Sequence, residues 1–361
     1  MEAPGRYYHG MRAIRWVVCV AAAVIGACAG EPDVEVASYS QSLDSCPDNQ
    51  CGDGNSPVID GVYFWKLYIA SVPGIPNFEG VTITDVDHPA EDQPMRLELD
   101  GDRLLGVDRN SGDVLRKDYD LIGTRIRVEV LGVPWEIRIT AAAPIEKFWV
   151  GGELPIWAYE FRYNPWGSPW GPHDPGKPLC SEADGDPNKL TAIVFGHELY
   201  NPDTKVITVG DTTAGWMNVA CTSSAIYKMH KTGYTSVAGA RLGISTSVAQ
   251  RRAMLNAWTS KVCGRGRAFT KSDEPLKLRE SLGLLPPDSA YLDPLDTAKT
   301  ASIEAIWGET GAVCLTVHRR EDNEATIRDE IDGKCGVLPP CDEWLGDWKL
   351  HGYVLTGNPR Q

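Results

Sequence analysis

The fold class is decided by the stretch RIRVEVLGVPWEIRI, residues 125–139. Polar and apolar side chains alternate over residues 125–130 and again over residues 135–139, which is the pattern of strands with one buried face. Residues 131–134 separate the two runs and contain the glycine and proline that favour a turn. We therefore predict an antiparallel β-hairpin with one face in the core and one face in solvent.

Similar patterns on both sides of the hairpin extend this prediction along the chain. Strands are predicted at residues 62–69, 156–163, 191–195, 205–209, 216–221 and 311–317. One helix should begin near residues 222–224 and end at Gly233, and a second should begin after Ser247, because hydroxyl side chains cap helix N-termini. The predicted fold class is α+β and β-rich, with antiparallel sheets and two or three helices in the C-terminal half.

Composition divides the chain into five parts. Residues 1–27 have the features of a lipoprotein signal peptide, and residues 28–60 are rich in Glu, Asp, Ser, Gly and Pro, as expected for a flexible tether. We expect a β-rich part at residues 61–179, an α+β domain at 180–345 and a loop-rich tail at 346–361.

The export signal ends at a cysteine. Arg12 and Arg15 precede the apolar residues 16–25, and small residues lead from there to Cys28. A basic start, a short apolar core and small residues before the cleavage site are typical of a secretory signal. The run ending at Cys28 resembles a bacterial lipobox, so we expect cleavage before Cys28 and a lipid on its thiol. Because Ala29 rather than aspartate follows, we expect the exported protein to be anchored to the envelope at the outer membrane.

The charge balance limits the classes of partner. The chain has 35 Lys and Arg against 49 Asp and Glu, a formal net charge of −14. Residues 1–27 contain three arginines and one glutamate, so the chain from Cys28 onward carries about −16. Such a surface repels nucleic acid and anionic lipid headgroups. We expect no nucleic-acid partner, and a membrane contact through the N-terminal lipid.

Eight cysteines remain once Cys19 has left with the signal and Cys28 has taken the lipid. They are Cys46, Cys51, Cys180, Cys221, Cys263, Cys314, Cys335 and Cys341. An even number in an exported chain predicts disulfide bonds, and the spacing lacks the paired Cys-x2-Cys of zinc sites. The connectivity stays open, although the pairs 46–51 and 335–341 are each close enough in sequence to close a short loop.

Three sequence blocks follow one another in the C-terminal half. The first is VACT (219–222) with KMH (228–230), the second is SKVCGRGRAFT (260–270) with LGL (282–284), and the third is IEAIW (303–307) with GAVC (311–314). In this order and spacing the blocks resemble the ADYC domain, a module of exported myxobacterial proteins with no assigned function. PLC (178–180) opens the match, which covers roughly residues 100–341. The resemblance implies an exported domain but no reaction.

Departures from the family pattern bear on the role of the cysteines. The family's Ala-Asp-Tyr-Cys corresponds to Ser-Lys-Val-Cys at residues 260–263, where only Cys263 and the glycines after it match. Two further family cysteines correspond to Met229 and Met254, one on each predicted helix. Their joint absence is what a missing disulfide would produce, which favours a structural role for the cysteines. Phe269 replaces a histidine that is frequent after the motif, which argues against that histidine as a catalyst.

Catalytic candidates are few, and we assign no catalytic residue and no cofactor. Cys221 has the position of a thiol nucleophile at a strand-to-helix junction, but the even cysteine count favours a half-cystine. His197-Glu198 lacks the second histidine of His-Glu-x-x-His because Asn201 occupies that position, so a surface loop is favoured. A cell-wall or extracellular hydrolase that uses Cys221 or acidic residues is the alternative function.

Two stretches are candidate binding sites. Asp184, Asp186 and Asn188 alternate oxygen ligands as a calcium loop does, although a polar turn is the simpler interpretation. Aromatic residues at 157, 159, 161 and 163 share one strand face, which favours a buried core face. Trp166 and Trp170 lie in the loop beyond and would stack on a glycan or a peptide. The sequence therefore predicts a non-enzymatic binding or structural module.

Overall fold

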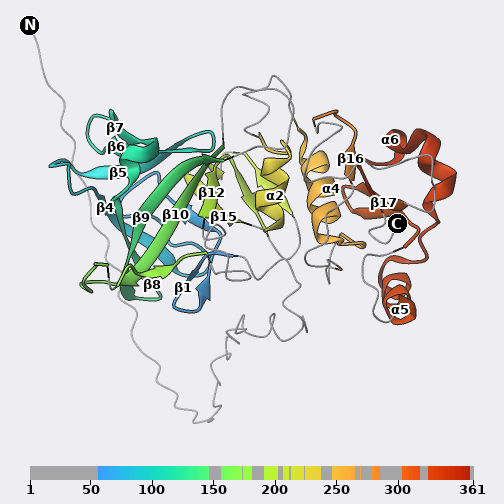
Figure 1. Cartoon of the computed structure of the whole chain (residues 1–361), viewed down its shortest axis with the longest axis horizontal. Helices are drawn as coiled ribbons and strands as arrows, with labels where there is room; N and C mark the ends of the chain where they lie inside the picture. Colours follow the sequence, from blue (N-terminus) through green and yellow to red (C-terminus); the bar gives the residue numbers. More distant parts are fainter. Residues whose placement is uncertain are drawn as a thin grey trace, which may run out of the picture. The chain divides into compact units, whose positions relative to one another are not determined.

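The fold was analysed in a computed structural model, which describes residues 56–145, 156–172, 174–180, 191–201, 206–210, 213–222, 224–236, 246–264, 269, 278–284, 303–317 and 324–357. Sheets of antiparallel strands dominate these residues, and the α-helices lie in the C-terminal half (Figure 1). The predicted β-rich α+β class is therefore confirmed. Across the described residues, every helix is too short or too polar to cross a lipid bilayer.

The largest sheet of the described chain contains the hairpin that the sequence predicts. Its order is β3-β15-β12-β10-β9-β8-β4, with β11 beside β10. The strands are β3 (Lys66–Tyr68), β4 (Val81–Asp87), β8 (Arg125–Val130), β9 (Val133–Ile145), β10 (Ile156–Pro165), β11 (Lys177–Pro178), β12 (Thr191–Phe195) and β15 (Trp216–Cys221). Strands β8 and β9 pair with Val130 opposite Val133, so the predicted hairpin is confirmed with a tight turn.

The two edge strands of this sheet, β3 and β4, are consecutive in the sequence and contact each other, so the sheet is curled. The Asn77 side chain donates to the backbone oxygen of Lys66 (2.8 Å), and the Gly74 amide donates to the backbone oxygen of Ile83 (2.7 Å). We call it the curled sheet. A separate meander packs with it, formed by β5 (Met95–Asp100), β6 (Arg103–Asp108), β7 (Val114–Lys117) and the 3-10 turn η1 (Asp118–Leu121). A short hairpin, β1 (Val58–Ile59) with β2 (Val62–Tyr63), begins the described chain.

Strands β12 and β15 of the curled sheet are buried on both faces. In β12, Ala192 and Val194 belong to the core enclosed by the curl, whereas Ile193 and Phe195 belong to a second core on the other side. The sequence TAIVF is apolar after its first residue because neither face of this strand meets solvent. Residue 180, where we expected a new domain to begin, therefore lies between strands of one sheet.

The second core is built by helices and a smaller sheet. Its main elements are α2 (Ala225–Lys231), α4 (Val248–Thr259), β13 (Glu198–Tyr200), β14 (Ile207–Val209), β16 (Leu278–Glu280), β17 (Ile303–Gly308) and β18 (Gly311–Leu315). Side chains of Ser224 and Ser247 cap α2 and α4, as predicted. Helix α2 packs on α4, and Met229 and Met254 are fully buried in this core.

The C-terminal segment is an integral part of the second half and not a loop-rich tail. It consists of α5 (Glu324–Cys335), η5 (Cys341–Asp347), α6 (Trp348–His351) and β19 (Val354–Gly357). Strand β19 lies inside a four-stranded sheet of order β16-β19-β17-β18. The prediction of a loop-rich tail is wrong because all four residues of β19 are buried and its backbone pairs on both sides.

Candidate functional site

Six of the eight cysteines expected in disulfides lie in the described residues, and all six are paired. The bonds are Cys180–Cys221, Cys263–Cys335 and Cys314–Cys341. The expected disulfides are thus confirmed for these cysteines, but a local 335–341 loop is wrong, because each of its cysteines bonds to a distant strand or helix end. Cys46, Cys51 and the expected lipidation site Cys28 lie outside the described residues.

Cys221 cannot supply the thiolate that a hydrolase would need. It ends β15, is 1% exposed, and its sulfur is bonded to that of Cys180. A nucleophilic cysteine requires a free and accessible thiolate. The structure therefore gives Cys221 the half-cystine role that the even cysteine count favours.

The residues of the ADYC motif form a turn that fits closely against the turn between β17 and β18. After α4 the backbone of Ser260 is left-handed (φ 47°), and the Ala312 amide donates to the Val262 carbonyl oxygen (2.7 Å). A Cβ added to Gly264 would lie 2.2 Å from the backbone oxygen of Thr310, and one added to Gly311 would lie 2.2 Å from that of Val262. A side chain at either position would overlap the backbone of the other turn, so glycine is needed at both and the motif packs two turns together.

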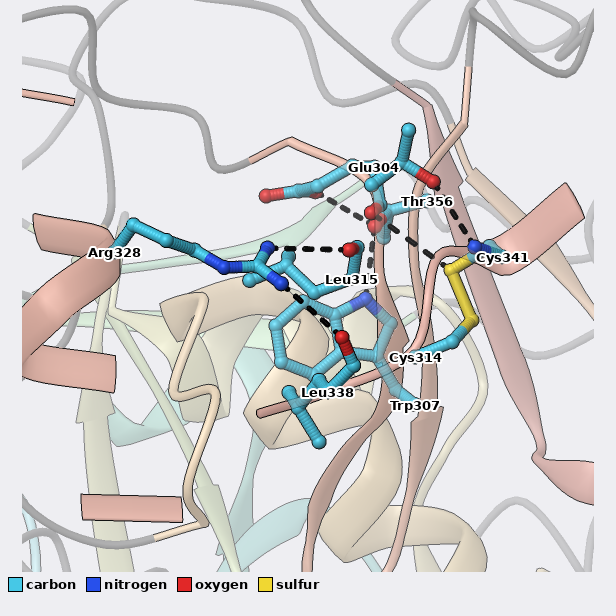
Figure 2. Close-up of a disulfide and its surroundings, with 9 residues drawn as sticks. Glu304, Trp307, Cys314, Leu315, Arg328, Leu338, Cys341 and Thr356 are labelled. Atoms are coloured by element: carbon cyan, nitrogen blue, oxygen red, sulfur yellow. Dashed lines mark hydrogen bonds between the residues drawn. A yellow bond between two sulfur atoms is a disulfide. The ribbon is translucent and has the colours of Figure 1, made fainter. Parts of the chain in front are cut away.

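A buried glutamate lies beside the third disulfide. Figure 2 shows Glu304 with Thr356 and Trp307 near the bond between Cys314 and Cys341. The Thr356 hydroxyl donates to the Glu304 carboxylate (2.6 Å) and accepts from the Trp307 indole N–H (2.8 Å). All three side chains are fully buried. Glu304 therefore acts within the core and is not accessible to a substrate.

A second buried carboxylate belongs to Glu198, which we expected in a surface loop. That expectation is wrong, because Glu198 lies in β13, is 0% exposed and forms an ion pair with Arg251 (2.7 Å). The Tyr200 hydroxyl also donates to it. Burial raises the pKa of Glu198, and Arg251 opposes that effect. No sequence motif links these residues, because they come from elements about fifty positions apart.

His230 lies next to this ion pair and stays neutral. Its ring contacts that of Phe195 in a tilted arrangement, with the ring centroids 3.8 Å apart and an interplanar angle of 33°. Burial, assisted by the positive charge of Arg251, lowers the pKa of His230 to about 3. In the described residues, no three His, Cys, Asp or Glu side chains are grouped as metal ligands. The candidate calcium ligands Asp184, Asp186 and Asn188 lie outside those residues, so that prediction is not addressed.

The aromatic side chains of β10 form a core face, as the sequence favoured. Tyr159, Phe161 and Tyr163 are buried in the first core, and Trp157 packs against it. The Tyr159 hydroxyl accepts a hydrogen bond from the Leu104 amide (2.9 Å). This face of β10 therefore packs the curled sheet against its meander. The two loop tryptophans are not part of this core face.

Trp166 and Trp170 lie over the outer face of the curled sheet. The guanidinium of Arg127 lies 4.2 Å from the Trp166 ring centroid, and that of Arg138 lies 4.2 Å from the Trp170 ring centroid. Trp166 is 44% exposed, whereas Trp170 is half-buried against Gly176. Stacking of a guanidinium on an indole stabilises both planes in one orientation.

Strand register arranges the charges of this face in two rows. In the first row Asp87, Arg125, Arg138 and Arg162 are lateral neighbours across β4, β8, β9 and β10. In the second row Asp85, Arg127 and Glu136 follow one another in the same direction, ending at Asn164. We call these two rows with Trp166 and Trp170 the arginine–tryptophan face.

Ion pairs hold the guanidinium groups of the face in place. Arg127 contacts Asp85 (2.7 Å) and Asp87 (2.9 Å), and Arg138 contacts Glu136 (2.6 Å). The side chains of both arginines keep about a third of their surface exposed, at 33% and 29%. The face thus offers flat aromatic surface beside ordered donors and acceptors, which suits binding of a polar ligand.

Comparison with known proteins agrees with the sequence blocks. A family model described as the ADYC domain matches residues 118–321. This chain belongs to the ADYC domain family. No curated protein and no solved structure matches it. The matched region spans the β8–β9 hairpin, the loop tryptophans and the motif turn, so the ADYC region contains both the structural motif and most of the arginine–tryptophan face.

Proposed function

We propose that this ADYC-family protein is an exported lipoprotein, anchored to the cell envelope through Cys28, that works as a non-enzymatic binding module. The arginine–tryptophan face is its binding surface, and the ligand is a glycan or a peptide. The outer membrane is the proposed location. Nucleic acid is not a proposed partner, because the net charge of −14 opposes it.

Export is supported by the disulfides. Three bonds join described cysteines, and disulfides persist in oxidising compartments such as the periplasm and the cell exterior. The basic, apolar and small residues before Cys28 support the same compartment from the sequence. The lipid itself is tested by the mass of the mature N-terminal peptide. We expect a diacylglyceryl addition that a Cys28→Ser variant lacks, and an unmodified Cys28 would overturn the anchor.

Binding is supported by the exposure and order of the face. Trp166 keeps 44% of its surface exposed although its ring already stacks on Arg127. Flat aromatic side chains bind sugar rings and extended peptides with little loss of conformational entropy. The carboxylates of Glu198 and Glu304 are 0% exposed, and each has an ion-pair or hydrogen-bond partner within the core. They are therefore not accessible to a substrate and do not favour a hydrolase.

The binding proposal is tested on glycan and peptide arrays probed with the mature protein. Trp166→Ala and Trp170→Ala should each raise the dissociation constant for a glycan or peptide that binds on the array by about tenfold, since each removes a stacking surface. Tyr119→Ala is the matched control, because Tyr119 is also exposed (57%) but lies in η1. Equal binding by all three variants, with unchanged circular dichroism, would contradict the arginine–tryptophan face as a site.

A further inference from the structure

Three apolar side chains project from one end of the curled sheet. Phe78 is 80% exposed, Leu131 is 69% exposed and Val133 is 52% exposed. We call these residues the apolar tip. Single exposed apolar residues are ordinary on a protein surface, but several gathered at loop ends indicate a contact with another phase or partner.

Strand register places the members of the tip together. Val81 lies opposite Val130, and Val130 lies opposite Val133, so the loop before β4 and the β8–β9 turn share one end of the sheet. The Leu131 amide donates to the Gly80 carbonyl oxygen (3.1 Å). A Cβ added to Gly80 would lie 2.7 Å from the Leu131 side chain, so the two loops are in direct contact.

At the apolar tip, Leu131 occupies a turn position whose left-handed backbone conformation is unfavourable for leucine. Leu131 and Gly132 both have positive φ, 49° and 84°, as in a type I′ turn. Such turns favour Asn-Gly, because asparagine tolerates the left-handed region better than leucine does. Leu131 therefore gives the turn neither backbone preference nor burial, and its exposed apolar side chain needs another explanation.

The chain enters the fold at this same end of the curled sheet. The Asp60 amide donates to the Tyr163 hydroxyl (3.2 Å), and the Val58 amide donates to the Leu179 carbonyl oxygen (2.9 Å). Tyr163 contacts Trp135 edge to face (5.7 Å), and Trp135 lies two residues after Val133 in β9. Figure 1 shows β1 near the lower end of β8. The described chain thus begins beside the apolar tip.

We propose that the apolar tip inserts into the lipid surface to which Cys28 anchors the chain, as a second membrane contact. This rests on the lipid anchor proposed above. A lipid on Cys28 would keep the fold near the surface and so raise the effective concentration of the tip there, so a few side chains suffice. Aromatic and aliphatic residues on a convex turn enter the interfacial region without burying a partner-shaped surface. The acidic net charge makes a zwitterionic surface the favoured one.

The proposal is tested with the full lipidated protein in vesicles of phosphatidylcholine with brominated acyl chains. A Phe78→Trp variant adds an emission component, which should shift to the blue and lose about half its intensity or more, as expected for an indole at the lipid interface. Val337→Trp is the matched control, because Val337 is 79% exposed and follows α5 in the other half of the fold. Equal quenching of the two probes would overturn the insertion of the tip.

Leu131→Asn separates insertion from folding. Asparagine suits the left-handed turn, so the unfolding midpoint should be retained or raised. In the Phe78→Trp background this change should lower the quenching at least about twofold, because it removes an inserted side chain. Unchanged quenching would count against the tip.

The mass of the N-terminal peptide reports the anchor independently of the tip. If Cys28 carries no lipid, the anchor fails and the tip is judged by flotation of the unlipidated mature chain with the same vesicles. Flotation that Phe78→Ser abolishes would then support the tip, and absence of flotation would overturn it.

Discussion

Two regions of this protein carry the same kinds of side chain in opposite surroundings. On the arginine–tryptophan face, Trp166 is 44% exposed and rests on Arg127. Around the four-stranded sheet, Trp307 is fully buried and donates to Thr356, which in turn donates to Glu304. The first arrangement leaves polar groups for a ligand, whereas the second uses them to specify the packing of one strand on another.

The two surroundings also differ in what a substitution should do. Exposed ion pairs contribute about 0–1 kcal/mol each to stability, because water screens them. Breaking a buried pair or hydrogen-bond network costs about 3–5 kcal/mol, since a polar group then stays in the core without a partner. Substitutions on the face should therefore alter binding with little change in stability, and substitutions in the second core should do the reverse.

The largest effect is expected where the motif turn meets the β17–β18 turn. Gly311→Ala should lower the free energy of unfolding by roughly 3–5 kcal/mol, because strain and backbone overlap add. Gly311 has φ 128°, and its added Cβ would lie 2.2 Å from the Val262 oxygen. Gly112→Ala is the control, since Gly112 also has positive φ (78°) but nothing within 4 Å of an added Cβ. Urea denaturation that gives equal losses would show that backbone strain, and not this contact, dominates.

A matched pair of glutamates tests the comparison directly. Glu304→Ala should lower the free energy of unfolding by about 3 kcal/mol, because the Thr356 and Ser260 hydroxyls lose their acceptor in the core. Glu160→Ala removes an ion pair to Arg162 of the face, in which both side chains are 20% exposed, and should cost about 1 kcal/mol or less. Chemical denaturation of the two variants checks this. If Glu160→Ala proved the more destabilising, the distinction between the regions would fail.

Acid should destabilise the second core through His230. The folded-state pKa is lowered to about 3 from the ordinary 6.5, so the unfolded chain binds a proton more readily between those values. The stability that neutral His230 contributes is present above pH 6.5 and is lost as the pH falls toward 3. At pH 5 the loss should be about 2 kcal/mol by linkage. Between pH 7 and pH 4 the free energy of unfolding should fall less steeply with pH for His230→Gln than for the unchanged protein. Identical slopes for the two proteins would exclude His230 as the cause.

Local sequence patterns predicted much of the fold. The β8–β9 hairpin follows from strict alternation, and α2 and α4 begin at Ser224 and Ser247 because each serine side chain accepts from an amide of the first turn. These are short-range effects, visible in a window of a few residues. The aromatic face of β10 was likewise correctly favoured as core.

Long-range pairing could not be predicted in the same way. Cys335 bonds to Cys263 across 72 positions, although Cys341 is six positions away, because α5 carries it back to the motif turn. Strand β19 was expected in a tail because a short VLTG run has no distinctive period, and only pairing with β16 and β17 makes it a strand. Glu198 and Arg251 meet only after the second core has formed.

The candidate site was partly visible in the sequence. Trp166 and Trp170 stand out by composition, but their stacking on Arg127 and Arg138 depends on the register of β8 and β9. The two charged rows likewise arise from residues on separate strands that happen to be lateral neighbours. Such a surface is a property of the folded sheet, so an alternating strand in the sequence shows only that one face is polar.

The smallest effect is expected at Glu79, a carboxyl group near the first core whose pKa is raised by burial. Glu79 follows Phe78, and among the described residues no side chain donates a hydrogen bond to its carboxylate. Its pKa is raised from 4.5 chiefly by burial, so the stability contributed by the protonated form is lost as the pH rises above that value. Glu79→Gln, which stays neutral, should raise the free energy of unfolding at pH 7 by less than about 1 kcal/mol. At pH 4 the gain should shrink. A gain that persists in acid would mean that the shape of the side chain, and not its charge, is the cause. The first core would then tolerate a half-buried carboxylate, whereas the buried carboxylates described in the second core have ion-pair or hydrogen-bond partners.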